Sequence, residues 1–140
     1  SIYMREPKAK IIMLGDLNDD PYNHSCKDVL IARKYREEVE PYGYFNTMWQ
    51  MLDRGTGSLA YNGGWNLFDQ IVCSRNMLDL DGKKEYKELT LYGYHIFKRD
   101  YLLQQEGKYK NTPKRTTSGG VWVNGYSDHW PTVTYLVKAM

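Results

Sequence analysis

The chain has 140 residues, the length of one ordinary domain, and its 19 Lys and Arg against 17 Asp and Glu give a formal net charge of +2. No apolar run reaches the roughly 18 residues of a membrane-spanning helix, and the near-neutral charge neither favours nor excludes a nucleic-acid partner. Leu, Ile, Val and Phe make up only about 21% of the residues, close to the level associated with disorder. Because 13 Tyr, four Trp and six Met supplement them, we expect a folded domain with a thin, aromatic core.

The first third of the chain predicts one strand and one helix. Residues 10–14 form a short, continuously apolar run, which is typical of a buried strand, and a polar loop follows it. A helix is expected over residues 25–40, because Ser25 and Asp28 have the spacing of a capping box and apolar residues then recur at helical spacing. A proline ends this predicted helix.

The middle of the chain predicts a second helix and a further strand. The helix is short and covers residues 48–52, with Asn46 or Thr47 as its cap. Residues 55–64 are rich in glycine and predict a loop or an irregular hairpin. Residues 67–73 read as a strand that is apolar on both faces except for one carboxylate.

The last third of the chain predicts strands separated by long connections. A strand is expected near residues 94–97 and a brief helical turn at 101–104, followed by a loop without periodicity over 108–120. The final strands cover 121–123 and 132–137, the latter with alternating side chains. The sum is a mixed α/β chain, rich in strands and loops, without internal repeats.

Three polar clusters stand directly beside the apolar strands. Residues 15–21 follow the first strand, at the kind of strand end where ligands bind in α/β sheets. Asp69 lies inside an apolar strand, where an unpaired carboxylate is costly to bury. Residues 127–131, Ser-Asp-His-Trp-Pro, place a carboxylate beside an imidazole, a pair that can hold a metal or a phosphate and move a proton. Each cluster alone also fits a structural role, namely an Asx-rich turn, a backbone cap and a structural histidine.

Taken together and in this order, the three motifs resemble those of the endonuclease/exonuclease/phosphatase superfamily. They are GDLNDDP at 15–21, WNLFDQI at 65–71 and GYSDHWP at 125–131, and the resemblance extends over residues 11–137. It implies an α/β (α+β) fold, a four-layer α/β/β/α sandwich of the deoxyribonuclease I type. It also implies a metal-dependent hydrolase of phosphate esters.

The resemblance assigns a role to five residues. Asp16 matches the carboxylate that orients or deprotonates the attacking water, and Asn18 matches the amide that binds the phosphoryl oxygen. His129 matches the histidine that faces the scissile phosphate, and Asp69 matches the carboxylate that fixes the orientation of this ring. Asp128 matches a ligand of a divalent metal, Mg²⁺ or Mn²⁺, to which Asp16 and Asn18 would also contribute oxygen atoms.

The sequence leaves the roles of several other residues open between two interpretations. The basic segment 108–115 is either a phosphate-facing loop or a solvated one. Trp65 is either a substrate-side aromatic or part of the core. Cys26 and Cys73 form either one disulfide or, as we expect, two buried thiols. His24 and His95 have no motif support and are expected to be structural or exposed.

The family's principal metal ligand is a glutamate on a strand before the first motif, and no residue of this chain matches it. We therefore expect residues 1–140 to be one globular unit that forms roughly the C-terminal half of the domain, a fragment with little or no activity of its own. The missing N-terminal half, or a second copy, would cover its exposed sheet. The alternative is a non-catalytic binding or scaffold module that retains the fold. The substrate stays open between nucleic acid, nucleotides, phosphoinositides and sphingolipids.

Overall fold

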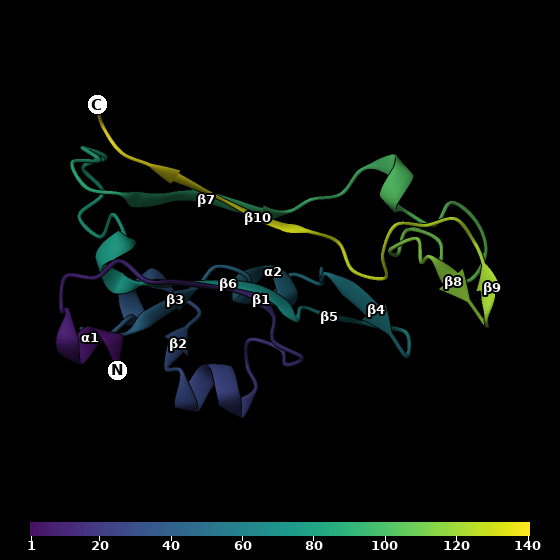
Figure 1. The fold of residues 1–140 in the computed structure, drawn as a ribbon, viewed down its shortest axis with the longest axis horizontal. Helices are drawn as coiled ribbons and strands as arrows, with labels where there is room; N and C mark the ends of the chain where they lie inside the picture. Colours follow the sequence, from purple (N-terminus) through teal and green to yellow (C-terminus); the bar gives the residue numbers. More distant parts are fainter.

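The computed structural model describes residues 1–140, with short helices and turns between ten strands (Figure 1). The helical elements are α1 (Ile2–Arg5), a π-helical turn η1 (Ser25–Val29), α2 (Trp49–Asp53) and the 3₁₀ turns η2 (Arg36–Glu38), η3 (Arg75–Met77) and η4 (Asp100–Leu102). The strands are β1 (Ile12–Asp16), β2 (Ala32–Arg33), β3 (Tyr44–Asn46), β4 (Leu59–Tyr61), β5 (Gly64–Asn66), β6 (Asp69–Ser74), β7 (Thr90–Ile96), β8 (Thr117–Ser118), β9 (Val121–Trp122) and β10 (Thr132–Val137).

Two β layers make up the body of the protein. The larger sheet has the strand order β1-β6-β3-β2, in which β6 pairs antiparallel with both β1 and β3. The second layer is the antiparallel pair of β7 and β10, which runs along one side of the larger sheet in Figure 1. The chain between β1 and β2 lies on the opposite side, and the small hairpin of β8 and β9 projects at one end.

The core lies between these two layers. One apolar cluster joins Phe45 and Cys73 of the larger sheet to Leu91 of β7. A second cluster joins Ile71 of β6 to Ile96 of β7, and it also includes residues that precede β6 and β10. Strand β6 contributes to both clusters, because alternate residues of a strand point to the same face. This strand therefore carries Asp69 at the end of the buried interface.

Most of the predicted strands are confirmed with bounds shifted by one or two residues. The strands expected at 10–14, 67–73 and 132–137 are β1, β6 and β10. The glycine-rich segment 55–64 contains β4 and the turn to β5, so it is part of a hairpin. The short helix predicted in the middle of the chain is α2. The predicted cap at Asn46 or Thr47 is wrong, because Met48 is the N-cap and no side chain caps the helix; Asn46 instead accepts a hydrogen bond from the backbone N–H of Met48.

The long helix predicted over residues 25–40 is wrong. Only two short turns, η1 and η2, form in this range, and the Ser25 hydroxyl donates to a carboxylate of the preceding loop instead of capping a helix. Ile31 has a left-handed φ of +59°, and Ala32, fully buried, pairs with Tyr44 in the parallel ladder of β2 and β3. Burial of a short strand in the sheet outweighs the local helical spacing, which takes no account of long-range partners.

The fold class is confirmed as a mixed α+β structure dominated by strands. The four-layer arrangement stays a prediction, because the helices seen here have at most five residues. For the same reason, none of the helices is long and apolar enough to cross a membrane.

Both cysteines are free and buried, as expected, and one of them makes stability depend on pH. Burial raises the pKa of the Cys73 thiol to about 12, whereas an unfolded chain ionises this thiol near pH 8.5. The protonated thiol thus supports the fold fully below about pH 8.5, and this contribution is lost as the pH rises toward 12. We expect the stability difference between wild type and Cys73→Ala in urea to shrink by about 2–3 kcal/mol from pH 7.5 to 10.5. A constant difference would contradict this assignment.

Candidate active site

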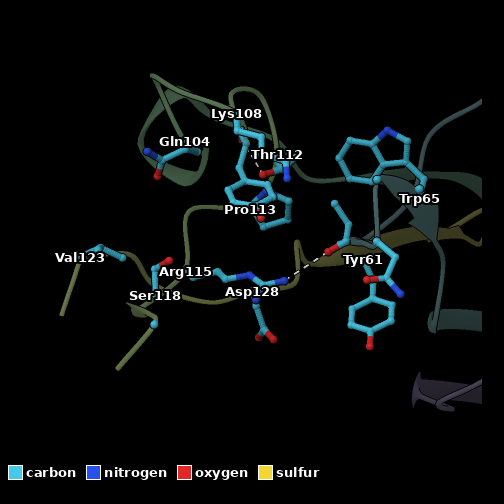
Figure 2. Close-up of a pocket in the computed structure, with 16 residues that line it drawn as sticks. Tyr61, Trp65, Gln104, Lys108, Thr112, Pro113, Arg115, Ser118, Val123 and Asp128 are labelled. Carbon is cyan, nitrogen blue, oxygen red and sulfur yellow. Dashed lines mark hydrogen bonds between the residues drawn. The ribbon is translucent and has the colours of Figure 1, made fainter. Parts of the chain in front are cut away.

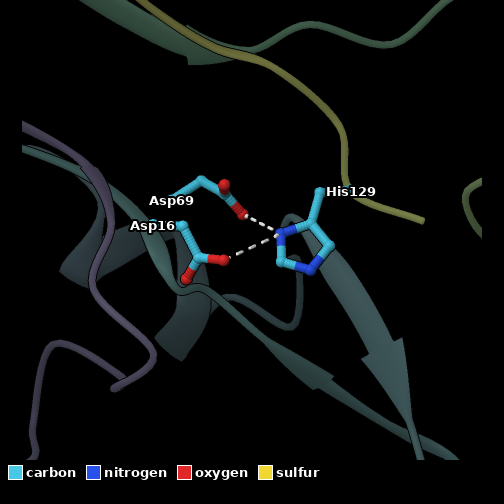
Figure 3. A group of neighbouring side chains, drawn as sticks. All are labelled: Asp16, Asp69 and His129. Atoms are coloured by element: carbon cyan, nitrogen blue, oxygen red, sulfur yellow. Dashed lines mark hydrogen bonds and ion pairs between the residues drawn. The ribbon is translucent and has the colours of Figure 1, made fainter. Parts of the chain in front are cut away.

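The register of β1 and β6 places two carboxylates side by side at the edge of the larger sheet. Asp16, the last residue of β1, is directly opposite Asp69, the first residue of β6. The turn before β10 then brings His129 onto the same spot, with its Nδ1 2.7 Å from Asp69 Oδ2 and 4.0 Å from Asp16 Oδ2 (Figure 3). One ligand atom from each of the three side chains lies within 4.8 Å of the others. Residues from three distant parts of the sequence thus form one compact group.

The hydrogen bond to Asp69 determines how the histidine can act. The Nδ1–H of His129 donates to Asp69, so the Nε2 atom is left for a ligand or for proton transfer. The side chains of His129 and Asp69 are 22% and 20% exposed, whereas that of Asp16 is 43% exposed. Asp16 is therefore the carboxylate of the group that is open to water, a metal or a substrate.

Ser58 is a component of the site that sequence reasoning missed. It is fully buried just before β4, and its hydroxyl donates a hydrogen bond to the same Asp69 oxygen that binds His129. Its carbonyl oxygen also accepts the backbone N–H of Trp130 at 2.7 Å, so it holds the turn that carries the histidine. The residue before Ser58 is a glycine for a steric reason. A Cβ at Gly57 would lie 2.3 Å from the carbonyl oxygen of Asn66, so a side chain at position 57 would push Ser58 away from the site. No local pattern distinguishes this serine within the glycine-rich segment.

We expect Ser58→Ala to lower the rate of phosphate-ester hydrolysis by about tenfold, because the carboxylate that orients His129 loses one of its two donors. The loss of a buried hydrogen bond should also lower the free energy of unfolding by about 1–2 kcal/mol. The matched control is Ser1, an exposed serine at the start of the chain and outside the site, whose replacement by Ala should leave the hydrolysis rate unchanged. Steady-state hydrolysis and urea unfolding measure the two effects. An unchanged rate in Ser58→Ala would show that this serine is structural only.

Loop 15–21 forms the Asx turn that the sequence analysis gave as one of its two interpretations. The same turn also orients the Asp16 carboxylate of the site. The backbone N–H of Asn18 donates to Asp16 Oδ1 at 2.9 Å, and Asn18 adopts a left-handed φ of +54°. The bond occupies one carboxylate oxygen of Asp16 and leaves the other directed at His129. Asn18 itself is exposed, so its amide is accessible from solvent.

Asp20 fixes this loop to the sheet and was given no role from the sequence. It is only 3% exposed, and its carboxylate accepts the backbone N–H of Leu67 at 2.6 Å and the side-chain amide of Asn66 at 2.7 Å. The hydroxyl of Tyr22 donates to it as well, and the negative charge of Asp20 raises the pKa of Tyr22. The buried carboxylate thereby joins the first motif to the second.

The structure places Asp128 outside the group of three. Its carboxylate is exposed and lines a groove next to the group, one residue before His129. Trp65, the aromatic with two interpretations, packs against Trp130 with ring centroids 5.2 Å apart and also lines this groove.

The remaining histidines lie away from the site. His24 is exposed and pairs with Asp28 at 3.0 Å. His95 of β7 stacks on Tyr135 of β10 with ring centroids 5.6 Å apart. Neither histidine contacts a residue of the group formed by Asp16, Asp69 and His129.

The donor atoms of the site suit a hard divalent cation. Asp16 offers an exposed carboxylate oxygen and Asn18 an exposed amide, and such oxygen ligands are those that Mg²⁺ and Mn²⁺ prefer. Two carboxylates around an imidazole at the edge of an α+β sheet are typical of hydrolytic enzymes that activate water.

The chain belongs to the Endonuclease/Exonuclease/phosphatase family, whose family model matches residues 1–138. Members of this family are generally phosphoesterases or nucleases and typically use divalent metals. Comparison with curated proteins gives no match, and no solved structure matches either.

Proposed function

We propose that this protein hydrolyses phosphate esters by attack of an activated water at phosphorus, with Mg²⁺ or Mn²⁺ as cofactor. The observation that carries the proposal is the hydrogen-bonded pair of Asp69 and His129 with the open carboxylate of Asp16 beside it. A purely structural histidine has no need of two carboxylates within 4.0 Å of one ring nitrogen. Membership of the family supports the reaction class, and this geometry supports the choice of residues.

Each side chain then has one task in the reaction. Asp16 orients the attacking water and accepts its proton. His129, held by Asp69 and protonated, donates from Nε2 to a phosphoryl oxygen as negative charge develops there. The amide of Asn18 donates to the same phosphoryl group. Asp69 and Ser58 position the imidazole and do not touch the substrate.

The metal would be held by Asp16 and Asn18, with Asp128 contributing from the adjoining turn. A bound divalent cation would neutralise charge on the phosphate and lower the pKa of the attacking water. Only one exposed carboxylate belongs to the group of three, so we expect weak metal binding and slow turnover by this chain. Further carboxylates from another polypeptide segment would be needed for tight binding.

Hydrolysis of a chromogenic phosphodiester by the purified chain tests the proposal. We expect slow product release with Mn²⁺ or Mg²⁺ that stops when EDTA removes the metal. Hydrolysis at the same rate in EDTA would contradict a metal-dependent reaction. Metal and substrate binding with no turnover at any protein concentration would instead support a binding module that retains the fold.

The edge strand β1 of the larger sheet also has an uncovered surface that we propose for self-association. Leu14 of β1 is directly opposite Ile71, which is 4% exposed, yet Leu14 itself is 69% exposed. β1 is the edge strand of its sheet, so its outer N–H and C=O groups have no strand partner. We expect the purified chain to dimerise through this strand, and Leu14→Lys to abolish the dimer. A monomer at high concentration in light scattering would contradict this expectation.

A further inference from the structure

A groove of about 810 Å³ opens directly beside the candidate active site (Figure 2). One wall is the hairpin of β4 and β5, residues 60–65, and the other is formed by residues 104–123. Asp128 lines the groove one residue before His129, and the lining Trp65 contacts Trp130 one residue after it. A substrate whose phosphate lies at His129 would therefore extend into this groove.

The side chains of the groove combine aromatic rings, cations and neutral amides. Tyr61 and Tyr109 are 65% and 60% exposed. The ammonium of Lys108 lies 5.5 Å from the centroid of the Tyr109 ring, on one face, so the opposite face is the one for a ligand. Lys108 and Arg115 supply two positive charges. Two amides on opposite walls, of Asn62 and Gln104, can donate and accept hydrogen bonds.

This combination fits a nucleotide better than the other phosphate esters. Exposed aromatic rings stack on unpaired bases, cations bind the phosphate backbone, and amides read the edges of bases. A headgroup with several phosphates would require more than these two cations, and the Asp128 carboxylate in the lining would repel it. A lipid chain would require an apolar lining, which the glycines, amides and hydroxyl groups of this groove do not provide.

A tight backbone contact holds the basic segment in place. A Cβ at Gly125 would lie 1.9 Å from the carbonyl oxygen of Lys114 and 2.2 Å from that of Arg115, so only glycine allows this approach. The N–H of Gly125 donates to the Arg115 carbonyl at 3.0 Å. The Arg115 guanidinium reaches across to the carbonyl of Ala60 at 3.2 Å, as Figure 2 shows, and its other N–H groups have no protein partner. The cation is thus positioned in advance, with donors left for an anion.

We infer that this groove binds the nucleotide next to the scissile phosphate of a single-stranded nucleic acid, with its base against Tyr109 and its phosphate on Lys108 and Arg115. The inference rests on the proposed function for the location of the scissile phosphate. It adds the substrate class and the residues that would select it.

Equilibrium binding of a fluorescent 12-nucleotide single strand, measured by anisotropy in EDTA, tests the inference without turnover. We expect Tyr109→Leu to weaken binding at least about fivefold, the loss of one base stack. Tyr92→Leu is the matched control, since Tyr92 is an equally exposed tyrosine on β7 away from the groove. Lys108→Gln should weaken binding about three- to fivefold, and Lys110→Gln, two residues along the same segment but outside the groove, by less than twofold.

Three results would overturn the inference. The first is no binding at millimolar protein, and the second is equal effects of the groove variants and their controls. The third is displacement of the strand by an inositol polyphosphate more effectively than by mononucleotides.

An abasic strand should bind wild type and Tyr109→Leu equally, because it has no base to stack. Loss of binding in the groove variants together with no hydrolysis would refute the proposed function alone, whereas hydrolysis with unaltered binding would refute this inference alone.

Discussion

Replacing His129 by Gln is expected to lower metal-dependent phosphodiester hydrolysis by about 10²–10⁴-fold. Gln keeps a polar side chain in the place of the ring but cannot carry the proton that the imidazole presents to the phosphoryl oxygen. The substitution also removes the imidazole nitrogen that donates to Asp69 at 2.7 Å, and with it the ring orientation that Asp69 provides. The rate with Mn²⁺ in excess, compared with wild type at the same protein concentration, measures the effect.

His95→Gln is the matched control for this substitution. His95 is also a partly buried histidine, but it stacks on Tyr135 and has no carboxylate partner. Its replacement should leave the rate within about twofold of wild type, since surface and stacking changes away from the site act only on stability. Equal rates in His129→Gln and wild type would remove the histidine from the proposed mechanism.

The largest loss of stability is expected for Asp20→Leu, about 3–5 kcal/mol in the free energy of unfolding. The substitution leaves the backbone N–H of Leu67 and the amide of Asn66 without their acceptor in a buried place. It also places an apolar side chain where a carboxylate with three donors fits. Because this carboxylate joins loop 15–21 to the end of β5 and the residue after it, just before Asp69, hydrolysis should fall as well.

Urea unfolding of Asp20→Leu, Asp20→Asn and Asp28→Asn gives the measurement and its control. Asp20→Asn keeps the size and part of the acceptor capacity, so we expect a smaller loss of about 1–3 kcal/mol. Asp28 is half exposed and pairs only with the exposed His24, so Asp28→Asn should change stability by less than about 0.5 kcal/mol. Equal stability of Asp20→Leu and Asp28→Asn would show that the Asp20 contacts do not hold the loop.

Features that depend on residues close together in the sequence could be predicted from it, whereas contacts between distant segments mostly could not. Strand β6 was predictable because its residues are apolar on both faces, and this pattern follows from burial on both sides. The contact between Asp69 and His129 was predictable only through the order of three motifs, since 60 residues separate the two. The helix over 25–40 was wrong because its apolar spacing belongs to a segment whose Ala32 is buried in a sheet.

The parts that sequence reasoning missed depend on long-range contacts. Ser58 orients Asp69 across 11 residues, and Asp20 accepts a hydrogen bond from a backbone 47 residues away. Neither residue type is distinctive in its local segment, where serine and aspartate are common in turns. The sequence predicted a loop over 108–120 and a strand at 121–123, with a phosphate-facing role for 108–115 left open, but it could not place this segment as a groove wall. Its position is determined by the close approach of Gly125.

Hydrolysis of a phosphodiester in ¹⁸O-labelled water, followed by mass spectrometry of both products, tests the central claim most directly. The proposed attack of an activated water at phosphorus predicts one ¹⁸O atom in the phosphomonoester product, none in the released alcohol, and no product when EDTA is present. Label in the alcohol, or product formation that persists in EDTA, would contradict metal-dependent attack at phosphorus by the site of Asp16, Asp69 and His129.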